Sequence, residues 1–377
     1  MKKLYALLVL ACMTLVAQAQ SLKSDMPIRA EKPSAHVLSS LQSISANSIL
    51  PNDNFVTTKR ASRRAVTNIS QLTGDFVAIS GSYDYDSETE ELVAATVPAT
   101  AFAVTITKTG NNTIGIKGLA GGDKVIKATV NLSEGTFSIA QDQVLYTSQS
   151  YGDVKITNSG SNAAITGKIY DDGLVFDNIW HEKIVYNKQT YRFSYFYTNT
   201  VIVKSNATMS FKSGTTNKSA KVLVAVDDGK YVASIFNFAD EGLIVGANLL
   251  EDNKFAIESQ LVLDGGDEQG LFYTYALSDD EESVSELIEG TGTDKVLTYD
   301  GKWTLYSETG YWFGAKSTLK VTITDDVTTF VYPSSSGISA IKTEKTDGAI
   351  YSIDGRRLNE VPSQGLYIRN GKKFFVK

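Results

Sequence analysis

Alternation of apolar and polar side chains is the feature that most limits what this chain can fold into. Beyond Thr67, apolar residues recur at every second position, most clearly over 102–107, 126–132 and 319–324. A period of two places one side of a strand against a core and the other side in solvent. Turn residues such as Asp-Gly and Gly-Asn interrupt these segments about every 8 to 12 residues, and no long amphipathic helix separates them. The pattern predicts antiparallel β structure, because parallel strand pairs need long crossover connections.

The β region contains two copies of one unit, offset by roughly 120 residues, which is the length of a whole domain. The matched segments are Val175–Trp180 with Thr298–Trp303, Ile165–Gly167 with Ile288–Gly290, and Phe137–Ile139 with Phe255–Ile257. We therefore expect an all-β chain with two tandem antiparallel domains, over residues 68–199 and 200–333. Each domain is a barrel or a two-sheet sandwich, and a barrel would remove exposed strand edges.

The first residues resemble a secretion signal. Lys2 and Lys3 precede an apolar run, and a small-x-small pattern places cleavage after Ala19. The alternative is a lipoprotein signal in which Cys12 becomes the lipid-bearing first residue. Residues 20–67 predict a flexible leader, or a pro-segment that is cut at the basic residues 59–64. No later segment is apolar enough to span a bilayer.

Cysteine, histidine and charge exclude several chemistries. Cys12 is the single cysteine and lies in the signal segment, so the mature chain has no thiol for a disulfide, a zinc site or a nucleophile. The two histidines are His36, in the leader, and His181, so a Ser-His-Asp relay would depend on His181. We expect no metal and no cofactor. A total of 36 Lys+Arg against 42 Asp+Glu argues against a nucleic-acid partner.

Aromatic residues supply the candidate ligand face. Tyrosines at positions 191, 195 and 197 alternate along a predicted strand, and Tyr311-Trp312 is the counterpart in the second unit. A buried tyrosine needs a partner for its hydroxyl, so such a stripe is typical of a core or of a partly wet binding surface. Trp180 and Trp303 are interpreted as core residues first. The candidate face consists of Trp180, His181, Tyr191, Tyr195, Tyr197, Tyr311 and Trp312.

Two short segments resemble known families. Leu72-Thr73-Gly74-Asp75-Phe76 resembles the Gly-x-aromatic opening of lipocalin-like (calycin) barrels and of β modules in exported Bacteroidota proteins. Residues 338–377 resemble the C-terminal sorting domain of type IX (Por) secretion cargo. The residues that match its pattern are Tyr351, Gly355, Arg356, Gly365, Tyr367, Gly371 and Lys372. The resemblance implies a small β tail that secretion machinery recognises, and a location outside the cell or on the outer-membrane surface, with the periplasm as the alternative.

These features predict an exported, non-enzymatic binding protein whose two β domains bind a glycan, a small apolar ligand or another protein. A carboxylate-based glycan hydrolase, which would need two carboxylates held across a cleft, is one alternative. A structural surface or fimbria-like subunit is another, and it would show long exposed strand edges. An open, aromatic-lined barrel mouth would favour a small ligand, whereas a filled core with an exposed aromatic strip would favour a glycan or a protein.

Overall fold

The computed structural model describes residues 66–86, 91–149, 151–186, 189–227, 229–265, 269–281, 283–307, 309–333, 350–352, 357–358, 365–369 and 372–376. The signal segment with Ala19, leader residues 20–65, and the tail residues Gly355, Arg356 and Gly371 lie outside these ranges, so their roles stay predictions. The chain divides into two compact units, Met1–Tyr332 and Pro333–Lys377.

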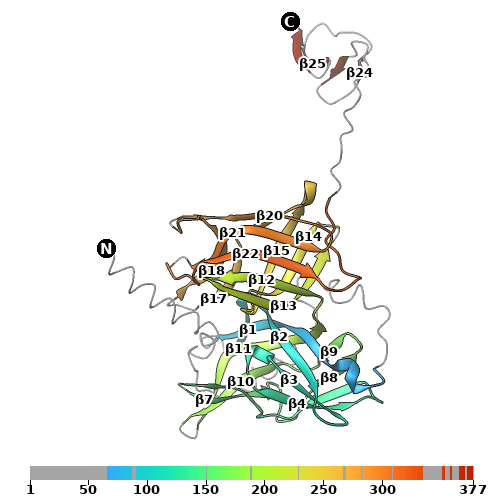
Figure 1. Ribbon diagram of the computed structural model, residues 1–377, viewed down its shortest axis with the longest axis vertical. Helices are drawn as coiled ribbons and strands as arrows, with labels where there is room; N and C mark the ends of the chain where they lie inside the picture. Colours follow the sequence, from blue (N-terminus) through green and yellow to red (C-terminus); the bar gives the residue numbers. More distant parts are fainter. Residues whose placement is uncertain are drawn as a thin grey trace, which may run out of the picture. The chain divides into compact units, whose positions relative to one another are not determined.

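The described elements are strands, apart from three short 3-10 turns, and the predicted all-β class is confirmed (Figure 1). The first unit contains two closed antiparallel barrels, which decides between the barrel and the sandwich that the sequence left open. The three turns are η1 (Ile69–Leu72), η2 (Leu119–Gly121) and η3 (Glu251–Asn253).

The first barrel is a closed ring of eight strands in the order β1-β2-β3-β4-β5-β8-β9-β11, and β11 pairs with β1 to close it. Strands β10, β7 and β6 continue from β11 as the first side sheet. The strands are β1 (Gly74–Asp86), β2 (Glu91–Lys108), β3 (Thr113–Lys117), β4 (Val125–Asn131), β5 (Thr136–Ile139), β6 (Val144–Ser148), β7 (Gly152–Asn158), β8 (Ile165–Tyr170), β9 (Gly173–Phe176), β10 (Trp180–Tyr186) and β11 (Gln189–Lys204).

The second barrel repeats this plan, with eight strands in the order β12-β13-β14-β15-β16-β20-β21-β22 and closure between β21 and β22. Strands β18, β17 and β19 continue from β21 as the second side sheet. The strands are β12 (Ala207–Ser213), β13 (Thr216–Asp227), β14 (Val232–Phe238), β15 (Leu243–Leu250), β16 (Lys254–Glu258), β17 (Leu261–Asp264), β18 (Leu271–Leu277), β19 (Val284–Ser285), β20 (Leu287–Gly292), β21 (Val296–Ser307) and β22 (Lys316–Ile323).

The two barrels share individual contacts as well as strand order. In each barrel, a glycine packs directly against a phenylalanine ring of the neighbouring strand. A Cβ atom on Gly167 would lie 2.4 Å from the ring of Phe137, and one on Gly290 would lie 2.4 Å from the ring of Phe255. The residue pairs that the sequence alignment matched therefore occupy equivalent positions in the structure.

Each barrel is filled by its own hydrophobic core. In the first, the indole N–H of Trp180 donates to the hydroxyl of Thr200 at 2.8 Å, and the ring stacks on Tyr197 with centroids 4.2 Å apart. In the second, Trp303 packs edge-on against Phe211 and Phe238 at 5.9 and 5.2 Å. Both tryptophans are fully buried, so the barrel interiors are occupied by the protein's own side chains.

A bulge interrupts the strand that closes each barrel. The pairing of β11 with β1 shifts around Asn199, which has a φ of 48°. The pairing of β22 with β12 shifts around Thr318, which has a φ of 54°. This left-handed conformation suits asparagine and is costly for a β-branched residue, so the second bulge holds local strain. Bulges redirect a strand, and both lie at the same place in the repeat.

The two barrels pack on each other through an apolar cluster that joins the outer wall at β1 and β11 to strands β13 and β14. Its buried members are Val77, Ile79, Ala101 and Val201 from the first barrel and Leu223, Ala225 and Phe236 from the second. The backbone N–H of Ala101 also donates to the carbonyl oxygen of Gly242 at 3.0 Å. The outer wall of the first barrel at β1 and β11 is therefore apolar and covered.

The tail forms a separate four-stranded antiparallel sheet in the order β24-β23-β25-β26. Its strands are β23 (Ile350–Ser352), β24 (Arg357–Leu358), β25 (Gly365–Arg369) and β26 (Lys372–Val376). Strand β25 pairs with β26 from Gly365 opposite Val376 to Arg369 opposite Lys372, and with β23 at its other edge. The small C-terminal β unit predicted from the sequence is present.

Candidate functional site

An aromatic face lies on the outer side of the second side sheet, where that sheet joins β21. Tyr273 of β18 pairs with Tyr306 of β21, and Tyr306 forms a bridge to Trp312 on its other side. Paired residues of antiparallel strands share a face, so the three side chains form one row across neighbouring segments. Tyr275 lies two residues along β18 and packs edge-on to Tyr306, with centroids 6.3 Å apart. Tyr311 precedes Trp312 in the chain and is 43% exposed.

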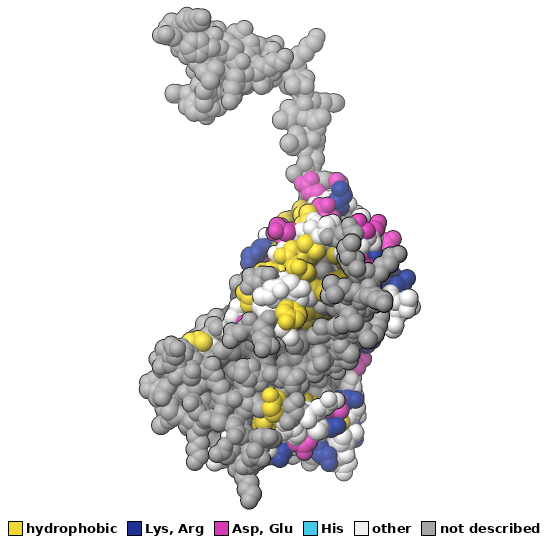
Figure 2. All heavy atoms as spheres, turned by 90° about the vertical axis from the view of Figure 1, so that its left-hand side faces the viewer, with side chains coloured by type: hydrophobic (Ala, Val, Ile, Leu, Met, Phe, Trp, Pro, Cys, Tyr) yellow, Lys and Arg dark blue, Asp and Glu magenta, His cyan; other side chains and the backbone are white. Residues whose placement is uncertain are grey.

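We call Tyr273, Tyr275, Tyr306, Tyr311 and Trp312 the aromatic face. Tyr306 is 36% exposed, and Tyr273, Tyr275 and Trp312 are half-buried. Figure 2 shows hydrophobic side chains gathered over the second barrel, with acidic and basic side chains at the margins of that area. Large aromatic side chains that stay in solvent at one place mark an interaction surface more often than single exposed residues do.

Hydrogen bonds hold the loop that carries Tyr311 and Trp312. The backbone N–H of Ser307 donates to the carbonyl oxygen of Tyr311 at 2.8 Å, and the N–H of Tyr311 donates to the Ser307 hydroxyl at 3.0 Å. The N–H of Phe313 donates to the carbonyl oxygen of Leu305 at 3.0 Å, and its ring packs against Phe272 at 5.0 Å. The loop is therefore fixed to β21 and to the core, and the aromatic face is preformed.

A buried lysine supports the same loop. Lys316 donates from Nζ to the carbonyl oxygen of Phe313 at 3.3 Å and lies 5.5 Å from the centroid of the Trp303 ring. Burial lowers the pKa of Lys316, and the nearby carboxylate of Glu241 acts in the opposite direction. Burial raises the pKa of Glu241, and Lys316 opposes that rise. Lys316 is 4% exposed, so it holds the loop from within and does not meet a ligand at the surface.

The candidate residues of the first barrel lie mainly in its core. Trp180 and Tyr197 are 0% and 3% exposed, so neither meets solvent while the barrel is closed. Tyr191 and Tyr195 lie in β11, but their side chains are outside the described part of the structure. The structure thus brings Trp180 and Tyr197 together as core partners, and Tyr311 and Trp312 together at the surface.

His181 is paired with Ser159, whose hydroxyl oxygen lies 2.7 Å from the ring atom Nδ1. The two residues are 7% and 4% exposed. A serine nucleophile needs an open side from which substrate reaches its oxygen, together with donors for the oxyanion. The buried pair fits a structural hydrogen bond between β10 and the residues after β7. In the described residues, no group of three or more His, Cys, Asp or Glu side chains is placed to hold a metal ion.

Sequence reasoning missed a buried carboxylate beside these residues. Glu182 is 3% exposed and accepts hydrogen bonds from the hydroxyls of Tyr146 and Tyr197 at 2.6 and 2.7 Å. The two tyrosines come from β6 and β11, so the cluster exists only after the first side sheet has folded against the barrel. It supplies the hydroxyl partner that a buried Tyr197 requires.

The aromatic face also contains residues that sequence reasoning missed, namely Tyr273, Tyr275 and Tyr306. The signal was present, because Tyr273 and Tyr275 alternate with Phe272 and Thr274. In β18 the phenylalanine side faces the core and the tyrosine side faces outward. Tyr306 follows the core residue Leu305 in the same way along β21.

The tail residues that the structure describes lie on three strands. Tyr351 is in β23, Gly365 and Tyr367 are in β25, and Lys372 is in β26. Tyr351 pairs with Ile368, and Tyr367 pairs with Ser352, so the two tyrosine-bearing parts of the motif lie on adjacent strands. Two segments of the predicted sorting pattern thus pair directly in the fold.

Comparisons with known proteins assign no function. No protein-family model matches the chain, and no curated protein matches it. A crystal structure of a protein of unknown function from the DUF3598 family of Nostoc punctiforme is similar at 10% identity, covering 68% of this chain and 97% of that chain, with a TM-score of 0.18. Within the described ranges, none of the helical segments has the length and apolar character needed to cross a bilayer.

Proposed function

We propose that the protein is an exported, non-enzymatic binding protein that holds a glycan on its aromatic face. The observation that carries the proposal is the row of the exposed Tyr306 and the half-buried Tyr273 and Trp312 across adjacent segments of one sheet. Aromatic rings offer a flat apolar surface for the C–H side of a sugar ring, and tyrosine hydroxyls offer hydrogen bonds to the sugar hydroxyls at its edge.

The packed interiors of both barrels support a surface ligand over an enclosed one. Small-molecule sites are concave, and they bury most of the ligand's surface. Here the centre of each barrel is taken by a fully buried tryptophan, Trp180 in one and Trp303 in the other, with aliphatic and aromatic neighbours around it. An apolar ligand would have to displace these side chains, whereas a glycan on the outer face displaces only water.

The size of the aromatic face supports a glycan over a protein partner. A fully exposed aromatic side chain presents about 200 Å². With Tyr306 and Tyr311 at 36% and 43% exposure, the five side chains together offer about 400 Å² at most. A standard protein interface buries about 800 Å² on each partner. A few sugar units match the smaller area.

Tyr306→Ala and Trp312→Ala are each expected to weaken glycan binding at least about tenfold, because each removes one ring of the row. The full chain would first be screened on a glycan array. The best oligosaccharide would then be titrated into the wild type and the variants by calorimetry. Tyr306→Phe keeps the ring and loses only the hydroxyl, so it is expected to retain most of the affinity.

The matched control is Tyr231→Ala, which removes a tyrosine of similar exposure, 37%, from the turn between β13 and β14. Its affinity is expected to equal that of the wild type. A glycan array without any specific binding would refute the proposal. Equal losses in Tyr231→Ala and Trp312→Ala would also refute it, since the effect would then not depend on the aromatic face.

We also propose that residues 338–377 direct the protein to the cell surface by the type IX route, as the resemblance of the tail implies. Support comes from the pairing of the two motif strands, β23 and β25, in one compact sheet. In a bacterium that has this machinery, deletion of residues 338–377 is expected to move the protein from the surface fraction to the periplasm. Unchanged surface labelling of the deletion variant by a membrane-impermeant reagent would contradict the assignment.

A further inference from the structure

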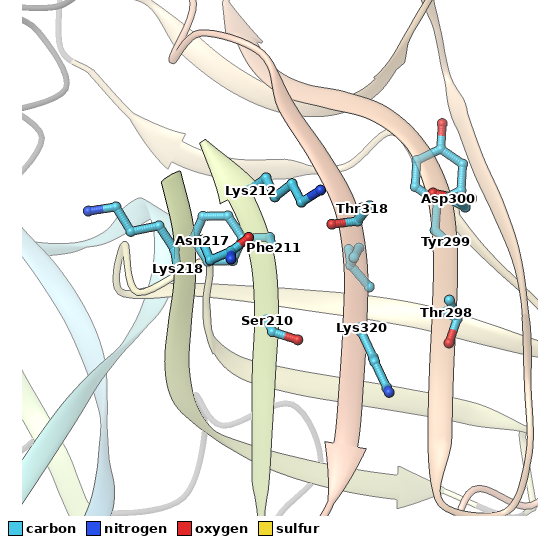
Figure 3. Close-up of a pocket in the computed structure, with 11 residues that line it drawn as sticks. Ser210, Phe211, Lys212, Asn217, Lys218, Thr298, Tyr299, Asp300, Thr318 and Lys320 are labelled. Atoms are coloured by element: carbon cyan, nitrogen blue, oxygen red, sulfur yellow. The ribbon is translucent and has the colours of Figure 1, made fainter. Parts of the chain in front are cut away.

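A pocket lies in the wall of the second barrel, away from the aromatic face, and has a volume of about 440 Å³. It lies over strands β12, β13, β21 and β22, and Figure 3 shows the side chains that surround it. Its polar lining includes Ser210, Lys212, Lys218, Thr298, Asp300 and Lys320. We call this space the wall pocket.

Two neighbouring irregularities accompany the wall pocket. The pairing of β22 with β12 shifts around Thr318, and the pairing of β21 with β22 shifts between Tyr299 and Lys302. Thr318 lines the pocket and is held at a φ of 54°. Bulges interrupt a ladder and often re-aim side chains next to functional sites, and strained backbone of this kind persists where the surrounding structure enforces it.

The charges at the wall pocket are mainly positive. Lys212, Lys218 and Lys320 are exposed, and none forms an ion pair within the described part of the chain. Asp300 is the one acidic side chain among the lining residues. Lys218 acts on Glu241, and in Figure 3 its side chain points away from those of Lys212 and Lys320. Figure 3 also shows the side chains of Lys212 and Lys320 pointing toward opposite ends of the pocket, so these two lysines do not converge on one point.

Hydroxyl groups lie on both sides of Lys320. Ser210 of β12 pairs with Lys320 of β22, and Lys320 pairs in turn with Thr298 of β21. The three residues form one row on the outer wall, and Figure 3 shows Ser210, Lys320 and Thr298 side by side. The hydroxyls of Ser210 and Thr298 have no hydrogen-bond partner among the described residues. Lysine and hydroxyl donors in one row match an oxyanion, which accepts several hydrogen bonds at once.

In the first barrel, the corresponding part of the wall is an apolar surface that contacts the second barrel. Val201 and Lys320 each lie two residues after the bulge residue of their strand, and they correspond in the repeat. Their partners Ile79 and Ser210 correspond in the same way, as do Val175 and Thr298. The first-barrel members of these pairs are apolar and belong to the cluster that the second barrel covers.

The same wall in the second barrel is polar, basic and open. A solvent-exposed wall needs only solubility, which scattered charges of both signs provide. Instead, Lys212, Lys218 and Lys320 line one concave site and form no ion pair within the described part of the chain. A concave site with lysine and hydroxyl donors around it suits a sugar-sized body that carries an anionic group.

We infer that the wall pocket binds a small sugar bearing a sulfate or phosphate group, with the oxyanion held by Lys320 and by the hydroxyls of Ser210 and Thr298, and with Lys212 at the other end of the pocket. The site is separate from the aromatic face and does not depend on the glycan function proposed for it.

The test is calorimetric titration of the full chain with glucose 6-sulfate, glucose 6-phosphate and glucose. Saturable binding of one or both esters is expected, and glucose is expected to bind at least about tenfold more weakly, because charge-assisted hydrogen bonds are roughly twice as strong as neutral ones. The K212Q/K320Q double variant is expected to lose at least about tenfold in affinity for the ester. Added salt is expected to weaken binding, since the lysines are exposed and screened.

The matched control is K127Q/K168Q, which removes two exposed lysines from β4 and β8 of the first barrel and changes the net charge equally. It is expected to bind the ester as the wild type does. Inorganic phosphate and sulfate are titrated in parallel and show whether the anion alone is sufficient.

Absence of saturable binding to either ester up to about 10 mM, which corresponds to a weak Kd, would overturn the inference. Equal losses in the two double variants would also overturn it. Trp312→Ala is expected to leave ester binding unchanged whether or not it abolishes glycan binding, so the two proposals fail separately.

Discussion

Trp303→Ala is expected to lower the free energy of unfolding by about 3–5 kcal/mol, the range for truncating a large buried aromatic side chain. Trp303 has no exposed surface and contacts Phe211 and Phe238 at the centre of the second barrel. Its removal also takes away the ring beside the buried ammonium group of Lys316. Urea unfolding followed by far-UV circular dichroism measures the change without relying on tryptophan fluorescence.

Trp180→Ala is the same experiment in the first barrel, and a loss of similar size is expected there. Trp180 stacks on Tyr197 and donates to Thr200, so its removal leaves a cavity and leaves the Thr200 hydroxyl with only its hydrogen bond to Ser80 among the described residues. Tyr311→Ala, which truncates an aromatic side chain that is 43% exposed, is the control and is expected to change stability by less than about 0.5 kcal/mol. A loss below about 1 kcal/mol in Trp303→Ala would contradict a packed barrel centre.

Gly290→Ala is expected to destabilise the second barrel by about 2–3 kcal/mol, the upper range for overpacking a core. The new Cβ atom would lie 2.4 Å from the ring of Phe255 and 2.4 Å from the carbonyl oxygen of Thr298. The ring is buried and the carbonyl belongs to the backbone of β21, so neither group can move away from the new Cβ atom without a cost in free energy. Gly167→Ala is expected to act in the same way, since its Cβ would meet Phe137 and the carbonyl oxygen of Val175.

Gly246→Ala is the matched control for these glycine variants. It also lies in a strand, β15, but the nearest atom to its Cβ would be Oε1 of Gln260 at an ordinary 3.6 Å. Alanine there is expected to leave stability unchanged or to raise it slightly, because glycine loses more backbone freedom on folding. If Gly290→Ala and Gly246→Ala had the same urea midpoint, close packing of Phe255 against β20 would be excluded.

Much of the fold could be predicted because its main signals are local. The alternation over 126–132 appears in β4, where every second residue from Val125 to Asn131 is buried. The repeat was visible because its matched residues are required by packing: Gly167 and Gly290 each lie against a phenylalanine where a side chain cannot fit. Such positions keep their residue type in both copies even when the surfaces differ.

The bulges and the sites could not be predicted, because they depend on pairing between distant strands. Continuous alternation was expected over 191–197, yet the pairing of β10 with β11 shifts between Arg192 and Phe196. A second shift at Asn199 follows, and Phe196, Tyr197 and Thr198 are buried in succession. The wall pocket depends on the bulge at Thr318, which the surrounding sequence does not mark. Of the predicted face, the structure brings Tyr311 and Trp312 to the surface, and their neighbours come from β18 and β21.

The contact between the barrels is made once in the chain. This contact is heterologous, because the β1–β11 side of the first barrel meets the β13–β14 side of the second. Head-to-tail contacts of this kind form filaments when every copy presents both surfaces. In the second barrel the first of these surfaces carries Ser210, Thr298 and Lys320. In the first barrel the register places Thr105, Thr107 and Lys117, all exposed, where the second barrel has Leu223, Ala225 and Phe236. Each end of the tandem is therefore capped by hydrophilic side chains, and divergence of the two copies limits the array to a single pair.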